Sequence, residues 1–418
     1  MTPDAIRTAR HTLLPNVLAV TAVVALLTPV VAPADDFETP TAVAVRDILP
    51  QAFLRSDHYA IEPEARAQDN FYVFRVHSDF GDYDITSLAM LRTRLHEIAT
   101  LAEVTPRLDD TVARLDRSPA GRRGVGSEHV VDILTDPVGT AAQLLGNLQY
   151  NVEQTLAGPG PADSADAGQG ALDLNPGPHK RSAAAQLGVD VYSSNPRLQG
   201  LLDALAEARS AGQTASSISP LVRNVYAPPR FGSGVLDMRL DSTLKNTGAE
   251  ALLAQIDRRL AALDVARRTR VAFLTHPAYT PRSRLYLTSY LELLGPLAGS
   301  GQILAAASTA VTEADAAAYV AYARMLAFYR LAGHDLAEVV TEARFPTLVD
   351  SARRGVLALP LDYLAWTPSV AQAVSALDDI RAAHDLSGFV LLVAGQASAR
   401  VAAELAARGI TAHAHYSY

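Results

Sequence analysis

Apolar residues recur every three to four positions through the middle of the chain, and this spacing constrains the fold more than any other feature. In the segment NPRLQGLLDALAEARSAG, the leucines that share one helical face are Leu198, Leu201, Leu202 and Leu205. Asn195 stands before this stripe and Gly212 behind it, and these residue types commonly begin and end helices. The segment is therefore predicted to be an amphipathic helix with one buried face.

Two further segments begin and end with the same types of helix-boundary residue. TPRSRLYLTSYLELLG begins with Thr280 as its candidate N-cap. TEADAAAYVAYARMLAFYRLAG opens with Thr312 and Asp315 at the spacing of a capping box and closes at Gly333. These patterns predict a largely helical region over residues 182–345.

Near the start of the chain, β-branched and aromatic residues gather in three short runs: Tyr59–Ile61, Phe71–Val76 and Asp82–Ile85. Turn-forming residues separate the runs, which is typical of a small antiparallel meander. Ser87 then stands as a candidate N-cap before a leucine stripe, so we expect a helix to lie on the sheet. Residues 35–156 are predicted to form this N-terminal α+β region.

The last part of the chain alternates between strand-like and helix-like segments. Strands are predicted for GVLALPLDYLAW, GFVLLVAG and the terminal segment ITAHAHYSY. Helices are predicted for the residues from Pro368 to Ile380 and for the segment ASARVAAELAARG. This succession predicts a small α/β layer over residues 346–418. Residues 157–181 are rich in Gly, Pro, Ala and Asp, which predicts a flexible linker. The whole chain is expected to be α+β and predominantly helical.

Residues 1–34 have the layout of a secretory signal peptide. Two arginines precede a long apolar run, and Ala32 and Ala34 then stand in the A-x-A arrangement of a cleavage site. We therefore expect export to the periplasm or the cell exterior. The apolar run is also long enough to span a bilayer, so an uncleaved N-terminal membrane anchor is the alternative.

Composition narrows the classes of function. The chain of 418 residues contains no cysteine, which excludes a thiol nucleophile, a cysteine-ligated metal site and lipidation on an N-terminal cysteine. Because no disulfide can form, stability must come from the core, and 49% hydrophobic residues are enough to build one. The net charge of −8 argues against a nucleic-acid partner.

The stretch VHSDFGDYDITS places Asp79, Asp82 and Asp84 close together after a strand-like run. Three carboxylates could bind a calcium ion if they converged, but their spacing does not match an EF-hand loop. The alternative is a hairpin in which Asp79 begins the turn, Gly81 supplies backbone freedom, and the later aspartates are solvated. The pattern favours the hairpin.

Two histidine patterns raise the question of a transition metal. His413 and His415 would share one face of a terminal strand and could bind zinc or copper with a third ligand, although simple solvation is the more common outcome. His96 and Glu97 begin an H-E-x-x-H motif that fails, because Thr100 stands where the second histidine is required. No metal site is therefore predicted.

One aromatic stripe could line a ligand groove. It consists of residues at helical spacing, namely Tyr319, Tyr322, Met325 and Tyr329. The pattern favours a core position with the tyrosine hydroxyls reaching hydrogen-bond partners. The helical region is nevertheless the place where an apolar pocket is expected.

No nucleophile elbow or phosphate-binding loop is present, so no catalytic residue and no cofactor can be assigned. The sequence favours an exported cell-envelope protein with a non-enzymatic structural or interaction role. Its expected partner is a protein or another envelope component, and its expected contact with a membrane is peripheral. One alternative is an exported hydrolase with a dispersed carboxylate or histidine site, which leaves no short motif. The other alternative is a protein that binds a small apolar ligand.

Overall fold

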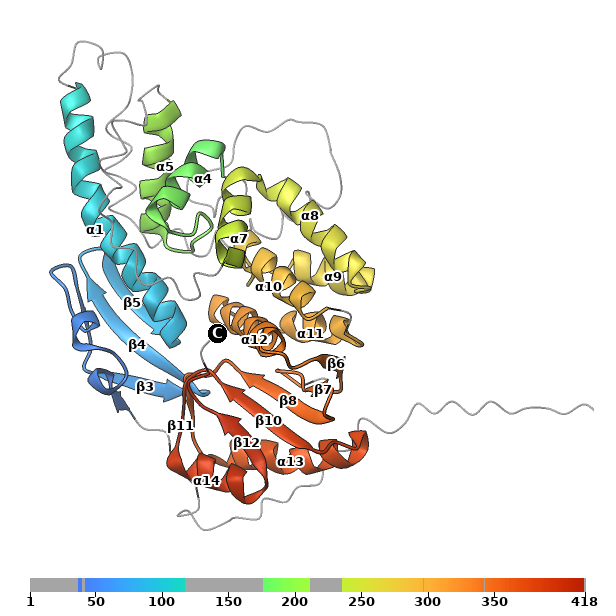
Figure 1. Ribbon diagram of the computed structural model, residues 1–418. Helices are drawn as coiled ribbons and strands as arrows, with labels where there is room; N and C mark the ends of the chain where they lie inside the picture. Colours follow the sequence, from blue (N-terminus) through green and yellow to red (C-terminus); the bar gives the residue numbers. More distant parts are fainter. Residues whose placement is uncertain are drawn as a thin grey trace, which may run out of the picture. The chain divides into compact units, whose positions relative to one another are not determined.

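The computed structural model describes residues 37–39, 42–116, 176–210, 235–295, 297–341 and 343–416. Residues Thr39–Tyr418 form one compact unit, which Figure 1 shows with its helices and sheets labelled. The predicted signal peptide of residues 1–34 and most of the predicted linker of residues 157–181 lie outside the described ranges. The predicted fold class is confirmed, because helices predominate and the strands form small separate sheets.

The N-terminal region contains the predicted antiparallel meander. Its strands are β1 Val43–Ala44, β2 Tyr59–Ile61, β3 Glu64–Gln68, β4 Phe71–Ser78 and β5 Gly81–Thr86, and short 3-10 turns cover Val45–Asp47 and Gln51–Phe53. Strands β3 and β2 pair with one side of β4, and β5 pairs with the other side. The sequence prediction missed β3, because EARAQ is mostly polar and buries only Ala65.

Helix α1, Leu88–Asp116, packs on the inner face of this sheet. Its leucine stripe is buried as expected, and Leu91, Leu95 and Ile98 share one core cluster with Phe74 and Val76 of β4. The predicted N-cap is confirmed, since the Ser87 hydroxyl accepts a hydrogen bond from the Met90 amide at 3.2 Å.

The middle of the chain is helical, as predicted. Its helices are α4 Pro178–Leu187, α5 Pro196–Ser210, α7 Val235–Asn246, α8 Ala249–Ala262, α9 Arg267–Leu274, α10 Pro281–Leu293, α11 Ser300–Ala307 and α12 Glu313–Leu331. Thr280 caps α10, and Thr312 with Asp315 forms the predicted capping box of α12. Helix α4 begins inside the predicted linker, because Pro178 occupies the first helical position, where a proline is tolerated.

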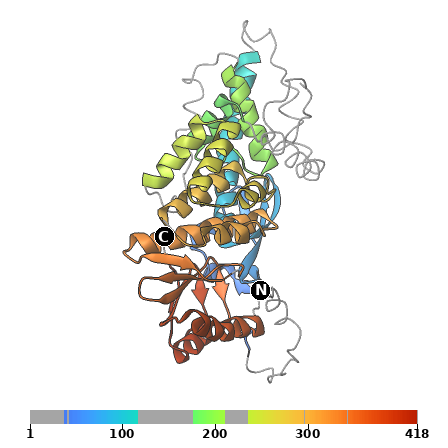
Figure 2. The same cartoon turned by 90° about the vertical axis from the view of Figure 1, so that its right-hand side faces the viewer.

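The C-terminal region is an α/β layer. Its elements are β6 Leu336–Val339, β7 Leu348–Asp350, β8 Arg354–Leu359, β9 Tyr363–Leu364, α13 Pro368–His384, β10 Gly388–Val393, β11 Gln396–Ala397, α14 Ala399–Ala407 and β12 Ile410–His413. The sheet order is β12-β10-β8-β7-β6, with β8, β10 and β12 parallel and the other pairs antiparallel. Figures 1 and 2 both show this sheet between α12 on one face and α13 with α14 on the other.

Strand β6 falls inside the region that the sequence predicted as helical. It joins the C-terminal sheet through β7 and does not continue α12. Gly333, with φ of 96°, ends the helix as predicted, and the chain turns back at once to pair as a strand.

The C-terminal layer is tied to the N-terminal meander through Asp362, which follows β8. The Asp362 carboxylate accepts hydrogen bonds from the Tyr72 amide of β4 at 3.1 Å and from the Leu88 amide at the start of α1 at 2.9 Å. Asn70 adds a carbonyl that accepts from the amides of Asp362 and Tyr363. The backbone of Gly395 passes so close that an added Cβ would lie 2.0 Å from the Asp362 carbonyl oxygen. The join therefore requires glycine at this position.

Across the described parts of the chain, no helix is both long enough and apolar enough to cross a membrane.

Candidate functional site

The three aspartates of VHSDFGDYDITS lie in a hairpin, which was the favoured interpretation. Asp79 and Phe80 form the two-residue turn between β4 and β5, and Gly81 has φ of 117°. Asp82 and Asp84 both face the solvent side of the sheet. There they share one cation, since Arg75 lies 3.2 Å from the Asp82 carboxylate and 2.6 Å from the Asp84 carboxylate.

Histidines complete this exposed network. His77 contacts Asp82 through Nδ1 at 3.0 Å and Glu62 through Nε2 at 3.1 Å, while His58 contacts Asp79 at 2.9 Å. Hydrogen bonds to Asp82 and Glu62 raise the pKa of His77. Asp82 and Asp84 are exposed to solvent, as predicted, and they also pair with Arg75 of the neighbouring strand.

The exposed aspartates give a first prediction. Replacing Asp84 by alanine is expected to change the free energy of unfolding by less than about 1 kcal/mol, because exposed ion pairs contribute little. Calcium is expected to leave the melting temperature unchanged, since Arg75 already lies between the two carboxylates. Thermal unfolding with and without millimolar calcium measures both effects, and a saturable rise of the melting temperature that Asp84→Ala abolishes would contradict the prediction.

The two C-terminal histidines do not share a strand face. Strand β12 ends at His413, and His415 lies in the following turn with φ of 51° and its amide bound to the Gly395 carbonyl. Both side chains are exposed. Within the described ranges, no group of three or more histidine or acidic side chains is placed to hold a metal ion.

The tyrosine stripe of α12 is part of the core, as the pattern favoured. Tyr319, Tyr322, Met325 and Tyr329 are all at most 4% exposed. The hydroxyl of Tyr322 donates to the Pro346 carbonyl at 2.8 Å. These side chains therefore hold α12 against the segment that leads into the C-terminal sheet.

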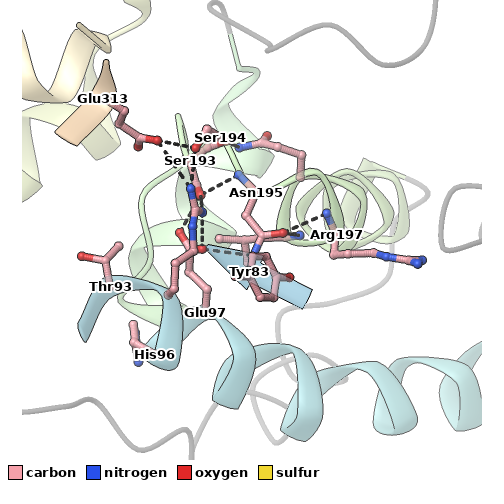
Figure 3. Close-up of polar contacts among 12 residues, drawn as sticks. Tyr83, Thr93, His96, Glu97, Ser193, Ser194, Asn195, Arg197 and Glu313 are labelled. Carbon is pink, nitrogen blue, oxygen red and sulfur yellow. Dashed lines mark hydrogen bonds and ion pairs between the residues drawn. The ribbon is translucent and has the colours of Figure 1, made fainter. Parts of the chain in front are cut away.

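A different set of polar side chains forms the candidate site, which we name the Glu97 cluster. Its members come from α1, from the segment before α5 and from the first residue of α12, and they are Arg94, Glu97, Ser193, Ser194, Asn195 and Glu313. Figure 3 labels all of them except Arg94 and shows the labelled side chains pointing toward one another from their separate elements.

Glu97 is the centre of the cluster and is only 2% exposed. Its carboxylate accepts three hydrogen bonds: from the Arg94 guanidinium at 2.6 Å, the Ser193 hydroxyl at 2.5 Å and the Asn195 amide group at 3.0 Å. A buried carboxylate with a cation and two neutral donors is well compensated for its lost hydration. The carboxylate therefore joins α1 to the start of α5.

Arg94 extends the join to α12. Its guanidinium donates to the Ser194 hydroxyl at 2.5 Å and to the Glu313 carboxylate at 3.4 Å, and Ser194 donates to Glu313 at 2.5 Å. The Glu313 side chain is 40% exposed, whereas that of Arg94 is 12% exposed. The cluster thus runs from a buried end at Glu97 to an accessible end at Glu313.

None of the known protein-family models, curated proteins or solved structures matches this chain.

A second acid lies next to the cluster. Burial raises the pKa of Asp190 to about 6, Arg282 and the Tyr192 amide oppose this rise, and the charges of Glu313 and Glu97 add to it. Arg282 in turn pairs with Asp241 of α7 at 3.0 Å. Polar groups therefore continue from the Glu97 cluster toward α7 and α10.

The chemistry open to the Glu97 cluster is limited by its own hydrogen bonds. Ser193 donates to the Glu97 carboxylate and Ser194 to the Glu313 carboxylate, so each hydroxyl is bound to a structural ion-pair partner and not to a histidine base. The Glu97 carboxylate already accepts from three donors, so three of its about four lone-pair sites are engaged. The arrangement is suited to holding three elements in a fixed relation.

The sequence contained only an indirect signal for this cluster. Glu97 drew attention only as part of a zinc motif that fails. Asn195 was predicted as a helix cap, and the structure confirms this, because the Asn195 side-chain oxygen accepts a hydrogen bond from the Arg197 amide at 3.1 Å. The small polar residues directly before Pro196 were the one available signal. Their partner on α1 lies about a hundred positions earlier in the chain and could not be identified from spacing.

A separate half-open cavity of about 500 Å³ lies where the β3–β4 turn approaches the loop between α11 and α12. Phe71 and Thr86 line it from the sheet, and Val311, Asp315 and Tyr319 line it from the helical side. Val311 is 85% exposed and is the most exposed of the large hydrophobic residues among the described positions. This cavity is where the helical region meets the solvent face of the meander.

Proposed function

We propose that this protein is an exported cell-envelope protein that works by binding a partner and not by catalysis. The observation that carries the proposal is the use of its buried carboxylates. Glu97 and Asp362 each accept hydrogen bonds from elements far away in the chain and so hold those elements together. Acids used in this way serve the architecture of a binding scaffold.

The position of Asp362 supports the same proposal. In open α/β sheets, ligands usually bind outside the carboxyl ends of the parallel strands. In this chain Asp362 follows the carboxyl end of β8, and its carboxylate is bound by the amides of Tyr72 and Leu88. The place that often holds a substrate is thus occupied by the N-terminal meander and the start of α1.

The proposed export rests on the sequence of residues 1–34, whose basic start, apolar run and A-x-A ending are typical of a signal peptide. The test is fractionation of the native host expressing the full chain with a C-terminal tag. We expect recovery in the exported fractions, together with a crosslinked envelope protein. The matched control lacks residues 1–34 and is expected in the cytosol, and recovery of the full chain in the cytosol would contradict the proposal.

One observation favours a second function, an exported hydrolase with a dispersed carboxylate site. The pKa of Asp190 is raised by burial and by the charges of Glu313 and Glu97, and a carboxyl with a raised pKa is what glycoside hydrolysis uses as its general acid. If this function holds, the wild-type protein hydrolyses members of a glycoside panel and Asp190→Asn abolishes that activity while the fold stays intact. Hydrolysis that depends on Asp190 would overturn the non-enzymatic proposal.

A further inference from the structure

Strand β5 is an open edge of the N-terminal sheet. Its pairing with β4 is fixed by the hydrogen bond from the Ser87 amide to the Tyr72 carbonyl at 2.8 Å. In an antiparallel pair, residues two apart repeat the same hydrogen-bonding role. The backbone groups of Asp82, Asp84 and Thr86 therefore point away from β4, and within the described parts of the chain no hydrogen bond reaches them.

The same three residues share one face of the sheet. Their side chains lie on the solvent side, because side chains two apart in a strand point the same way and the pairs Arg75↔Asp84 and Val73↔Thr86 are opposite one another. Thr86 at the end of this row lines the cavity described above, together with Val311. The open edge thus leads from two acidic side chains to a cavity that is lined in part by apolar side chains.

We propose that the open edge of β5 binds an extended basic segment of a partner protein, which adds to the sheet as a further strand and places one apolar side chain in the cavity beside Thr86. This inference rests on the proposed interaction function and names the class of its partner. Main-chain hydrogen bonds to an exposed edge supply affinity in such complexes, and pockets for alternate side chains supply specificity.

Charge is the reason for a basic segment. Side chains of an added strand that lie on the solvent face would stand beside Asp82 and Asp84, and opposite charges across neighbouring strands stabilise the pairing. These two carboxylates are about half exposed and share Arg75, and His77 contacts Asp82 and Glu62, so three carboxylates face one permanently charged cation here. Asp69 in the cavity lining adds another exposed carboxylate, while the Arg344 cation of the lining is paired with Asp315.

The apolar end of the segment follows from the cavity. Phe71, Val311 and Tyr319 line it together with polar residues, so an aliphatic or aromatic side chain would cover the apolar part of its surface. The distance along β5 also suits this arrangement, since the strand has six residues and can place two basic side chains and one apolar side chain on the same face.

Edge strands in soluble proteins are also protected by charged side chains that prevent pairing. This simpler role predicts that no peptide adds to β5. The two possibilities differ in the effect of backbone changes, because pairing needs the outward amide of Asp84 whereas protection does not.

The experiment uses the full chain and synthetic, dye-labelled peptides of about nine residues, which is long enough to cover the strand. The test peptide alternates lysine with threonine and ends in leucine. One control carries glutamate in place of lysine, a second has the same composition in scrambled order, and a third is N-methylated on the amides facing β5. Fluorescence anisotropy is expected to show saturable binding of the test peptide and at least about tenfold weaker binding of all three controls.

Variants of the protein separate charge from pairing. Asp84→Ala tests the carboxylate, and Asp84→Pro also removes the outward amide, which an edge strand tolerates because that amide is outside the ladder. We expect Asp84→Pro to bind the test peptide about tenfold more weakly than Asp84→Ala, with circular dichroism unchanged. Val311→Asp is expected to abolish the preference for leucine at the end of the peptide.

Hydrogen exchange gives a readout that does not depend on the variants. The amides of Asp82, Asp84 and Thr86 are expected to become protected when the test peptide binds. No saturable binding, equal binding of the scrambled or N-methylated peptides, or protection elsewhere in the chain would each overturn the inference. If the exported protein still crosslinks to an envelope partner in those cases, the proposed function stands and only its assignment to β5 fails.

Discussion

Replacing Glu97 by alanine is expected to lower the free energy of unfolding by about 3 to 5 kcal/mol, the usual cost of removing one partner from a buried ion pair. Glu97 is 2% exposed and accepts from Arg94, Ser193 and Asn195. Without the carboxylate, the Arg94 cation keeps only the distant Glu313 oxygen at 3.4 Å and two hydroxyls. Equilibrium denaturation in urea measures the effect.

Two matched variants test the cause. Glu97→Gln keeps the shape and one acceptor oxygen, so it is expected to cost less than Glu97→Ala. Asp84→Ala removes an exposed carboxylate from a similar Arg–Asp pair and is expected to cost less than about 1 kcal/mol. Equal stability losses for Glu97→Ala and Asp84→Ala would show that the buried hydrogen bonds do not hold α1 against α5.

Replacing Asp362 by alanine is expected to destabilise the protein by about 1 to 3 kcal/mol, because two backbone amides lose their acceptor. These are the amides of Tyr72 and Leu88, and the second belongs to the first turn of α1. Asp362→Asn is the matched control, since its amide oxygen can still accept. Denaturation at pH 7.5 is expected to give Asp362→Ala as the least stable of the three proteins.

The same position is expected to make stability depend on pH. Burial raises the pKa of Asp362 to about 6, although the Tyr72 and Leu88 amides oppose this. The folded protein therefore binds a proton that the unfolded chain, with an aspartate pKa near 3.8, has already lost. The resulting stabilisation is complete below about pH 4 and is lost as the pH rises through about 6.

Asp362→Asn isolates this effect from the similar titration of Asp190. Subtracting the pH profile of the variant from that of the wild type is expected to leave a fall of up to about 3 kcal/mol between pH 4 and pH 7. An opposite slope, with wild-type stability rising over this range relative to the variant, would show that the two amides outweigh the cost of burying the charge.

Local features of the fold could be predicted from the sequence. Helix starts at Thr280 and Thr312 were correct because a capping hydrogen bond joins residues only three positions apart. The hairpin at Asp79 was also predicted correctly, because its turn joins Ser78 and Gly81, which are only three positions apart. Strand β3 escaped prediction because its five residues bury only one side chain, so its position depends on pairing with β4 and not on its own pattern.

The candidate site could not be predicted because its partners are distant in the chain. Ser193 lies 96 residues from Glu97, and Glu313 lies 219 residues from Arg94. A single carboxylate on a helix gives no periodic signal, and its burial becomes visible only when the elements that cover it are in place. The motifs that were visible in the sequence were the three aspartates and the terminal histidines. Both groups are exposed, and a hairpin and the end of β12 account for their positions.

The bond between Asp362 and the start of α1 also bears on how the chain is made. The acceptor for the Leu88 amide is synthesised 274 residues later, and the acceptor for the Tyr72 amide 290 residues later. The N-terminal meander therefore cannot complete its contacts until almost the whole chain has left the ribosome, and contacts of such long range slow folding. The start of α1 and strand β4 therefore stay without this shared acceptor until late in synthesis, so the two elements are joined to the C-terminal layer in one of the last steps of folding.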